Sequence, residues 1–210
     1  MLLDFNELYK KYDLSDVRGI IHIGAHYGEE HETYEKYEHI KNYVYFEPLI
    51  SNYEILYNKL SDKENVSLVK MALGNENKEV YMNVETANNG QSSSILEPKL
   101  HLKQYPHIVF DKKEKVKMVK LYDYFHKNKK INDYNFINID VQGYELEVFK
   151  GAGDLLNKID YIITEVNRDE LYLDCPHIIE LDKYLMNFNF IRLETTWDGI
   201  TWGDAFYVKK

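Results

Sequence analysis

The sequence predicts a doubly wound α/β fold, in which a mainly parallel sheet is covered by helices on both faces. Three observations support this prediction. Short apolar strands alternate with helical patterns along much of the chain, as parallel βαβ crossovers require. The first apolar run, 20–23, ends in a glycine-spaced turn, and the second, 43–46, ends in the acidic Glu47. Doubly wound sheets bind their ligands at such strand ends.

The composition describes an ordinary globular protein of 210 residues, 44% of them hydrophobic, and this length favours one domain. The formal net charge of −9 argues against nucleic acid as a partner and favours neutral or cationic ligands. The single cysteine excludes an intramolecular disulfide framework. We find no signal-peptide core and no apolar run near the roughly 20 residues of a membrane span. The expectation is a cytoplasmic protein.

Residues 1–18 are expected to form an N-terminal helical segment, because apolar side chains recur at near-helical spacing from Leu2 to Tyr12. Residues 19–210 are expected to form the main domain. Its first half is predicted to alternate strands and helices, with strands at 20–23, 43–47 and 66–70 and helices at about 29–40 and 49–60. Pro48 is expected just inside the start of its helix, where its missing N–H costs nothing.

The alternation of strands and helices stops after Gly74. Residues 75–119 hold two short strand-like runs, 79–84 and 115–119, around a polar stretch. We expect this segment to be an insertion over the carboxyl edge of the sheet, where open α/β folds bind ligands.

The alternation then resumes and ends in a predicted hairpin. The expected order is a helix at 121–127, a strand at 135–140, a helix from about 145 to just before 151, a strand at 161–166 and a helix at 177–187. The last two strands, 190–194 and 205–208, flank a turn rich in Trp and Gly, which indicates an antiparallel hairpin.

The first two strand ends together predict a nucleoside site. Gly24 and Gly28 frame a G-x-x-x-G turn in which backbone can approach a ligand closely. The dinucleotide pattern G-x-G-x-x-G is absent, so a nicotinamide or flavin pyrophosphate fits poorly. Glu47 follows Gly24 by 23 residues, and a carboxylate at this position can accept from both ribose hydroxyls. A purely structural turn and a solvated strand end remain the alternatives.

Five motifs in order resemble the FkbM family of S-adenosylmethionine-dependent methyltransferases: IIHIGAHYGEE, YFEP, MALG, GQSSSI and NFINIDVQGYELEVFKGA. The resemblance covers nearly the whole chain from about Gly19. It implies a Rossmann-like seven-stranded sheet of order 3-2-1-4-5-7-6 and S-adenosylmethionine as cofactor. It also implies methylation of a hydroxyl oxygen, most often on a sugar of a glycan or glycoside.

The resemblance, together with the strand ends, assigns a set of residues to the cofactor: Gly24, His26, Gly28, Glu47, Ala72 and Asp140. Two positions depart from the family pattern. His22 stands where the family usually has an acidic residue, and a hydrogen-bonded strand histidine is its alternative interpretation. Gln142 replaces the more usual Glu of the D-V-x-G-x-E motif, which removes one negative charge.

Asp140 is the first candidate for a catalytic residue, because it ends a strand at the switch point of the sheet. A carboxylate there can orient or deprotonate an acceptor hydroxyl, and it complements a positive sulfonium. Glu165, at the next strand end, is the second candidate base. Asp140, Glu165 and Asn167 also invite comparison with metal-dependent catechol-type O-methyltransferases. The spacing around Glu165 differs from theirs, so we predict no metal.

The acceptor is expected to meet hydroxyl, imidazole and aromatic side chains of the insertion and hairpin, namely Ser92, Ser93, His101, Tyr105, Trp197 and Trp202. Aromatic faces suit sugar stacking, although Trp is also a frequent core residue. Two functions remain as alternatives. One is a noncatalytic module that binds a nucleoside or cofactor, and the other is a metal-dependent O-methyltransferase acting on a non-sugar small molecule.

Overall fold

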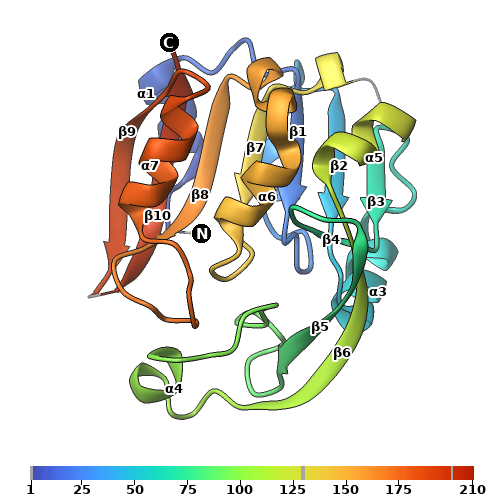
Figure 1. Cartoon of the computed structure of the whole chain (residues 1–210). Coiled ribbons are helices and arrows are strands. Elements are labelled where there is room, and N and C mark those ends of the chain that lie inside the picture. The colour runs from blue at the N-terminus through green and yellow to red at the C-terminus, as the bar shows by residue number, and fades with distance from the viewer. Residues whose placement is uncertain (1, 129–130, 200) are drawn as a thin grey trace.

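The computed structural model describes residues 2–128, 131–199 and 201–210 (Figure 1). Its central sheet has seven strands in the order β3-β2-β1-β7-β8-β10-β9. Strands β4, β5 and β6 belong to a second sheet, so the seven central strands counted along the chain read 3-2-1-4-5-7-6. The predicted fold class and order are confirmed. The N-terminal segment and the hairpin turn each include one residue, 1 and 200, that lies outside the described ranges.

Five strands of the central sheet run parallel to one another. In chain order these are β1 (Gly19–Ile23), β2 (Asn42–Phe46), β3 (Val66–Val69), β7 (Phe136–Ile139) and β8 (Tyr161–Asn167). The hairpin of β9 (Phe190–Asp198) and β10 (Trp202–Lys209) adds two antiparallel strands. All five residues of β1 are buried. A nearly continuous apolar run of this kind suits a strand that is covered on both faces.

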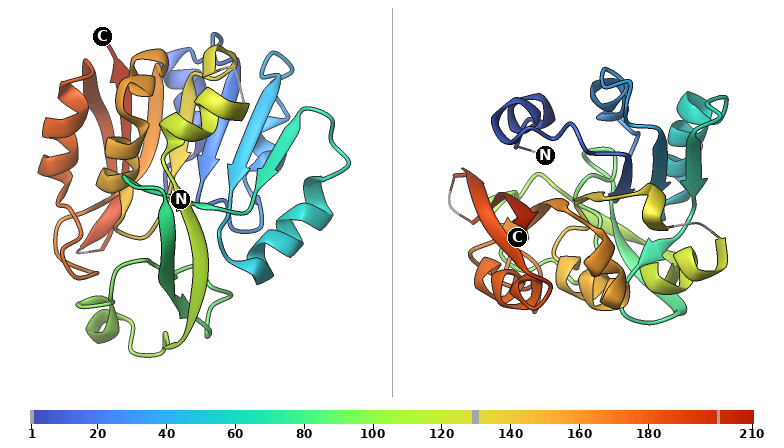
Figure 2. Two further views of the ribbon diagram at one scale, coloured as in Figure 1. Left: turned by 45° about the vertical axis from the view of Figure 1, so that its right-hand side comes forward. Right: turned by 90° about the horizontal axis from the view of Figure 1, so that it is seen from above.

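Helices cover both faces of the sheet (Figure 2). One face carries α1 (Phe5–Tyr12), α2 (His31–Tyr34) and α3 (Ile50–Leu60), and the other carries α5 (Leu121–Asn128), α6 (Glu145–Ala152) and α7 (Ile178–Met186). Ile20 packs with the first group, whereas Ile21 and Ile23 pack with the second, because successive side chains of a strand alternate between faces. Short 3-10 helices span Ile131–Asp133 and Gly153–Lys158. Within the described ranges, no helix is long and apolar enough to cross a bilayer.

The insertion forms a second sheet beyond the carboxyl ends of the parallel strands (Figure 1). Its strand order is β4-β6-β5, with β4 (Ala72–Leu73), β5 (Lys78–Glu85) and β6 (Phe110–Val119). Strands β5 and β6 pair as long antiparallel arms, and the chain between them carries the short helix α4 (His101–Gln104). Both strand-like runs of the insertion are therefore confirmed, and each extends further than the sequence predicted.

Several element boundaries differ from the prediction, among them both hairpin strands, which are longer than expected, and the ends of three helices. The expected helix 29–40 is helical only in α2, and tight turns follow, in which the N–H of Tyr37 and of Ile40 each donate to the carbonyl three residues earlier. Pro48 precedes the N-cap residue of α3 instead of lying inside the helix. Helix α6 continues through Gly151. Gly151 permits close packing there, because an added Cβ would lie 1.9 Å from the carbonyl oxygen of Gly74.

Candidate active site

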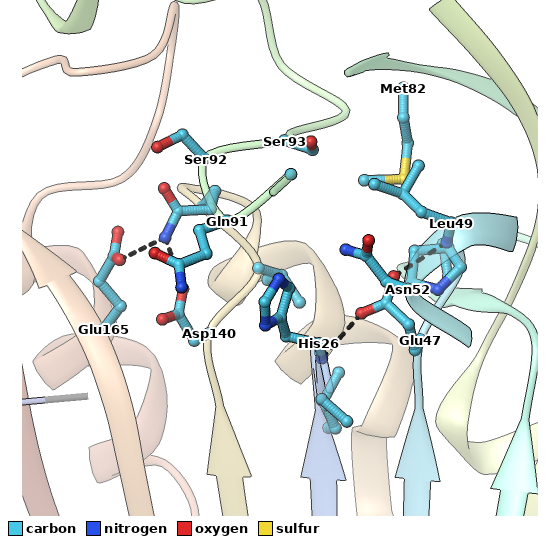
Figure 3. Close-up of a pocket in the computed structure, with 18 of the residues that line it drawn as sticks. His26, Glu47, Leu49, Asn52, Met82, Gln91, Ser92, Ser93, Asp140 and Glu165 are labelled. Atoms are coloured by element: carbon cyan, nitrogen blue, oxygen red, sulfur yellow. Dashed lines mark hydrogen bonds between the residues drawn. The ribbon is translucent and has the colours of Figure 1, made fainter. Parts of the chain in front are cut away.

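A cavity of about 610 Å³ opens between the carboxyl ends of the central strands and the insertion. Its volume lies in the usual range for small-molecule sites. Figure 3 shows Glu47 and Asp140 on opposite sides of this cavity, with His26 between them. Ser92 and Ser93 of the insertion lie across the cavity from the strand ends (Figure 3).

The turn after β1 brings two strand ends together. Gly24 adopts a left-handed φ of +77°, and an added Cβ would lie 1.8 Å from the carbonyl oxygen of Asp140. Only glycine allows this approach, and Gly24 lines the cavity. Gly28 also has a positive φ, but its added Cβ would meet Leu56 of α3 at 2.7 Å. It is not among the residues that line the cavity, so the structure gives Gly28 a packing role.

Glu47 is a buried carboxylate held by backbone. Its side chain accepts hydrogen bonds from the backbone N–H of His26 and of Leu49, both at 2.9 Å. Burial raises the pKa of Glu47 to about 7, against the effect of these two donors. A carboxylate offers about four acceptor positions, so roughly two remain for ligand hydroxyls.

His26 joins the turn after β1 to the insertion. Its Nδ1 lies 2.6 Å from Glu29 Oε1, and its Nε2 lies 3.0 Å from the carbonyl oxygen of Asn89. Both partners only accept, so the charged imidazolium alone can donate to both. Burial lowers the pKa of His26, but the Glu29 and Asn89 hydrogen bonds outweigh it and leave the pKa raised.

His22, the first departure from the family pattern, lines the cavity from β1 and is 2% exposed. Burial lowers the pKa of its ring, although the nearby Glu30 acts in the opposite direction. The His22 Nε2 lies 4.0 Å from Glu30 Oε2, too far for a direct hydrogen bond. His22 is therefore a neutral strand histidine at neutral pH.

Three carboxyl groups gather at the ends of β7 and β8. Asp140 follows β7, Glu145 opens α6 and Glu165 lies in β8, and one oxygen from each lies within 4.8 Å of the others. Burial, followed by the charges of Asp140 and Glu145, raises the pKa of Glu165 well above its ordinary value. Burial also raises the pKa of Glu145 to about 7. The cluster therefore holds at least one proton at neutral pH, because such close buried carboxylates do not all ionise.

Gln142 lies at the centre of this cluster. Its Nε2 is 2.7 Å from Asp140 Oδ1 and 2.7 Å from Glu165 Oε2. Its Oε1 accepts from the hydroxyl of Tyr172 at 2.8 Å, and its backbone carbonyl accepts from the hydroxyl of Ser94 at 2.7 Å. The residue that the sequence marked as a departure thus connects both candidate bases to the insertion.

Asn167, which the comparison with metal-dependent O-methyltransferases grouped with Asp140 and Glu165, does not line the cavity. It is 1% exposed at the end of β8. Both atoms of its side-chain amide lack a hydrogen-bond partner among the described residues. The structure brings Glu145 to the cluster in its place.

Most of the side chains expected to contact the acceptor line the cavity, namely Ser92, Ser93, His101, Tyr105 and Trp202. The indole N–H of Trp202 donates to the hydroxyl of Tyr105 at 2.9 Å. Trp197 does not line the cavity, and the guanidinium of Arg168 covers its ring at 3.7 Å. The register explains the difference: Trp197 pairs with Gly203, the neighbour of Trp202, and neighbouring residues of a strand face opposite sides.

A sequence model described as the methyltransferase FkbM domain matches residues 22–192. The chain belongs to the FkbM methyltransferase family. Among curated proteins, the 2-O-methyltransferase NoeI of Sinorhizobium fredii (strain NBRC 101917 / NGR234) is 36% identical over 81 residues. That alignment spans 39% of this chain and 33% of NoeI, about a third of the relative's length.

Solved structures share the fold of this FkbM-family protein. M. capricolum TrmK in complex with its cofactor product S-adenosyl-homocysteine has a TM-score of 0.54 at 10% identity, covering 100% of this chain and 70% of that chain. Magnesium protoporphyrin IX methyltransferase (ChlM) from Synechocystis PCC 6803, with bound cofactor, has a TM-score of 0.50 at 9% identity. The match covers 98% of this chain and 76% of that chain. At such identities the likeness concerns the fold alone.

The residues that line the cavity of this FkbM-family protein fit S-adenosylmethionine. Glu47 offers acceptor positions for hydroxyls at one side. At the other side the carboxyl groups of Asp140 and Glu165 suit a positive sulfonium, and the buried Oε1 of Glu165 has no hydrogen-bond partner among the described residues. Ala72, predicted from the MALG motif, lies on an apolar part of the lining.

Sequence reasoning missed several lining residues of this FkbM-family protein. Leu49 and Asn52 line the cavity from the start of α3, and Met82 lines it from β5 (Figure 3). Asn52 is 3% exposed, yet a polar residue in a helix normally indicates the solvent side. The packing of α3 decides which of its faces meets the cavity, so no local pattern could have identified these residues.

Proposed function

We propose that this protein transfers the methyl group of S-adenosylmethionine to a hydroxyl oxygen on a sugar of a glycan or glycoside. One observation carries the proposal. A single continuous cavity joins Glu47, Asp140 and the neutral hydrogen-bonding side chains of the insertion. A cofactor held at Glu47 and an acceptor held by the insertion would both meet at the end of β7, where Asp140 lies.

In this proposal the residues of the cavity divide into two groups. Glu47 accepts from the ribose hydroxyls, and Leu49, Ala72 and Met82 provide an apolar surface for the adenine. The backbone of the turn at Gly24 approaches the amino-acid part of the cofactor. The insertion and Trp202 surround the acceptor.

Asp140 is the proposed base. The cofactor supplies a methyl group that its positive sulfonium has already activated. Asp140 orients the acceptor hydroxyl and takes its proton while the new oxygen–carbon bond forms, so alignment and proton transfer are the protein's main contributions. Glu165 suits this role less, because burial and the charges of Asp140 and Glu145 raise its pKa well above its ordinary value and so favour the neutral acid. Asp140 is half-buried and lines the cavity directly.

An uncharged acceptor suits the charges of the cavity. No Lys or Arg occurs among its lining residues within the described ranges, whereas Glu29, Glu30, Glu47, Asp140 and Glu165 do. A phosphorylated or carboxylated acceptor would meet this negative field without a strong cation to balance it. The name of the relative NoeI, a 2-O-methyltransferase, supports transfer to oxygen.

A metal-dependent O-methyltransferase is the second candidate, because the three carboxyl groups lie close enough to share an ion. Its acceptor would be a non-sugar small molecule with two adjacent oxygens that can bind the same ion. Chelation distinguishes the two candidates, since only this second one needs the ion for turnover.

The test is to incubate the protein with S-adenosylmethionine labelled with ¹³C at the methyl group and a panel of acceptors. The panel pairs neutral glycosides with their sulfated or uronic-acid counterparts, and NMR of the products identifies the atom that carries the label. We expect an O-methyl group on a neutral sugar. A label on nitrogen or carbon contradicts O-methylation. Calorimetric binding of the cofactor without turnover of any acceptor would favour a noncatalytic module.

A further inference from the structure

We propose that the side-chain amide of Gln142 is a positioning group of the reaction, which fixes Asp140 against Glu165 at a place that a shared cation would otherwise fill. The inference rests on the proposed role of Asp140 as base. It is carried by the four hydrogen bonds of Gln142, which reach two strand ends, the loop after β8 and the insertion.

The chemistry of its neighbours determines the orientation of this amide. The carboxylate oxygens of Asp140 and the paired oxygen of Glu165 accept hydrogen bonds, so the NH₂ end of Gln142 must face them. The carbonyl end faces the hydroxyl of Tyr172, which is a donor. The opposite orientation would place the carbonyl oxygen of Gln142 against the carboxylate of Asp140, which can only accept.

One nitrogen therefore holds two carboxyl groups. Because Nε2 lies 2.7 Å from an oxygen of each, the amide fixes the separation of Asp140 and Glu165. It engages Oδ1 of Asp140, and the acceptor hydroxyl would approach the other oxygen. The two N–H groups also offset part of the repulsion within a cluster in which Glu145 contributes a third carboxyl group.

The backbone of Gln142 is held in an unusual conformation. Its φ of +55° is left-handed, a region that non-glycine residues adopt rarely and only where their surroundings impose it. The hydroxyl of Ser94 holds the carbonyl of Gln142, and the hydroxyl of Tyr172 lies 2.7 Å from the carbonyl of Ser92 as well. The segment that surrounds the acceptor therefore also determines where the amide lies.

The amide occupies the space that a metal ion would need. An ion shared by Asp140 and Glu165 would take their oxygens as ligands at roughly 2.0–2.6 Å, but Nε2 already lies between those oxygens. Gln142→Glu would replace this donor with another acceptor, and the enlarged carboxyl cluster would then require a cation or a further proton. Wild-type turnover should need neither Mg²⁺ nor Mn²⁺, whereas the Gln142→Glu variant should respond to both.

The principal variant is Gln142→Met, which keeps the length of the side chain and removes the donor. We expect kcat to fall by about 10- to 100-fold, as when hydrogen bonds to a charged group are lost, while KM for S-adenosylmethionine stays near the wild-type value. The acidic limb of the pH–rate profile should move to higher pH, because the amide favours the charged carboxylate. Asn157→Leu is the matched control, since it also exchanges a side-chain amide for an apolar group of similar size, and Asn157 is exposed and does not line the cavity.

Several titratable groups either contact this amide or act electrostatically on Glu165 beside it, and their titration would appear in the same profile. They are Asp140, Glu145, Glu165, Asp204 and Tyr172. A double-mutant cycle isolates the part of the Gln142→Met effect on turnover that acts through Asp140. If Gln142 acts by positioning Asp140, Gln142→Met combined with Asp140→Asn should be no slower than Asp140→Asn alone.

The outcomes separate this inference from the proposed function. If Asp140→Asn is slow but Gln142→Met turns over at the wild-type rate, the positioning role is overturned and the base is retained. If Asp140→Asn itself is as fast as wild type, Asp140 is not the base, and both the base assignment and the positioning role are overturned. A double variant much slower than Asp140→Asn also overturns the positioning role. Should Gln142→Met not fold, the Gln142→Glu variant decides: wild-type turnover in EDTA would contradict the inference, and rescue by Mg²⁺ or Mn²⁺ would support it.

Discussion

Glu47 shows how one residue can create a ligand site by being buried at a strand end. Backbone N–H groups of His26 and Leu49 hold its carboxylate at the cavity. We expect Glu47→Ala to weaken S-adenosylmethionine binding by about 1–3 kcal/mol, the cost of losing hydrogen bonds to a charged group. Isothermal titration calorimetry measures the effect. Glu54→Ala, an exposed change on α3, is the control, and unchanged affinity in folded Glu47→Ala would remove the ribose assignment.

The same residue predicts a pH dependence of cofactor binding. Since burial raises the pKa of Glu47 to about 7, the carboxylate predominates above pH 7 and the neutral acid below it. The neutral acid is a weaker acceptor for ribose hydroxyls, so S-adenosylmethionine affinity should fall as the pH is lowered from 8 to 6. Titration of the cofactor itself affects every variant equally. Glu47→Gln should therefore lose the Glu47 part of this pH dependence, and an identical profile in both proteins would contradict the assignment.

At the scale of elements, the contact between the ends of β1 and β7 shapes the cavity. Gly24 has a φ of +77°, and a Cβ would lie 1.8 Å from the carbonyl oxygen of Asp140. Gly24→Ala should therefore separate these strand ends, destabilise the protein by about 3 kcal/mol or more, and abolish cofactor binding. Denaturant unfolding and calorimetry measure the two effects.

Gly153→Ala provides the matched control for this prediction. Gly153 also has a positive φ, +51°, but an added Cβ would meet nothing within 4 Å. It should cost only the backbone strain of about 1–3 kcal/mol and leave cofactor binding intact. Equal destabilisation by both changes would show that the contact with Asp140 is not what requires glycine at position 24.

The hairpin and α2 show where sequence patterns stop being informative at this scale. Trp197 and Trp202 look equivalent in the sequence, but the pairing register places them on opposite faces of the hairpin. The apolar spacing of 29–40 resembles a longer helix, yet the single turn of α2 and the tight turns after it bury Tyr34 and Ile40 equally well. The apolar spacing therefore indicated which side chains are buried, and not that the whole segment is a helix.

For the whole molecule, the sequence was sufficient for the sheet because buried parallel strands leave strong signals. Runs such as 20–23 and 136–139 are apolar at three of their four positions and are followed by turn or acidic residues. The site was less accessible to prediction. Glu47 and Asp140 end strands and could be placed from the order of elements, whereas the hydrogen bonds of Gln142 depend on Tyr172 and on the folded insertion.

Metal removal tests the whole molecule under catalytic conditions. We expect turnover to persist in EDTA, because the Gln142 amide already links Asp140 and Glu165. Protein dialysed against chelator should turn over the same acceptor as untreated protein at an equal rate. Loss of activity that Mg²⁺ or Mn²⁺ specifically restores would instead favour an ion held by the carboxyl cluster.

The most direct test of the account is Asp140→Asn, measured for turnover and for cofactor affinity in the same preparation. The change keeps the shape of the side chain and removes the base, so turnover should fall by about 10²- to 10⁴-fold while the Kd for S-adenosylmethionine changes far less. The acidic limb of the pH–rate profile should also disappear. Near wild-type turnover would transfer the role to Glu165 or His101, and loss of cofactor binding in a folded variant would place Asp140 in the cofactor site alone.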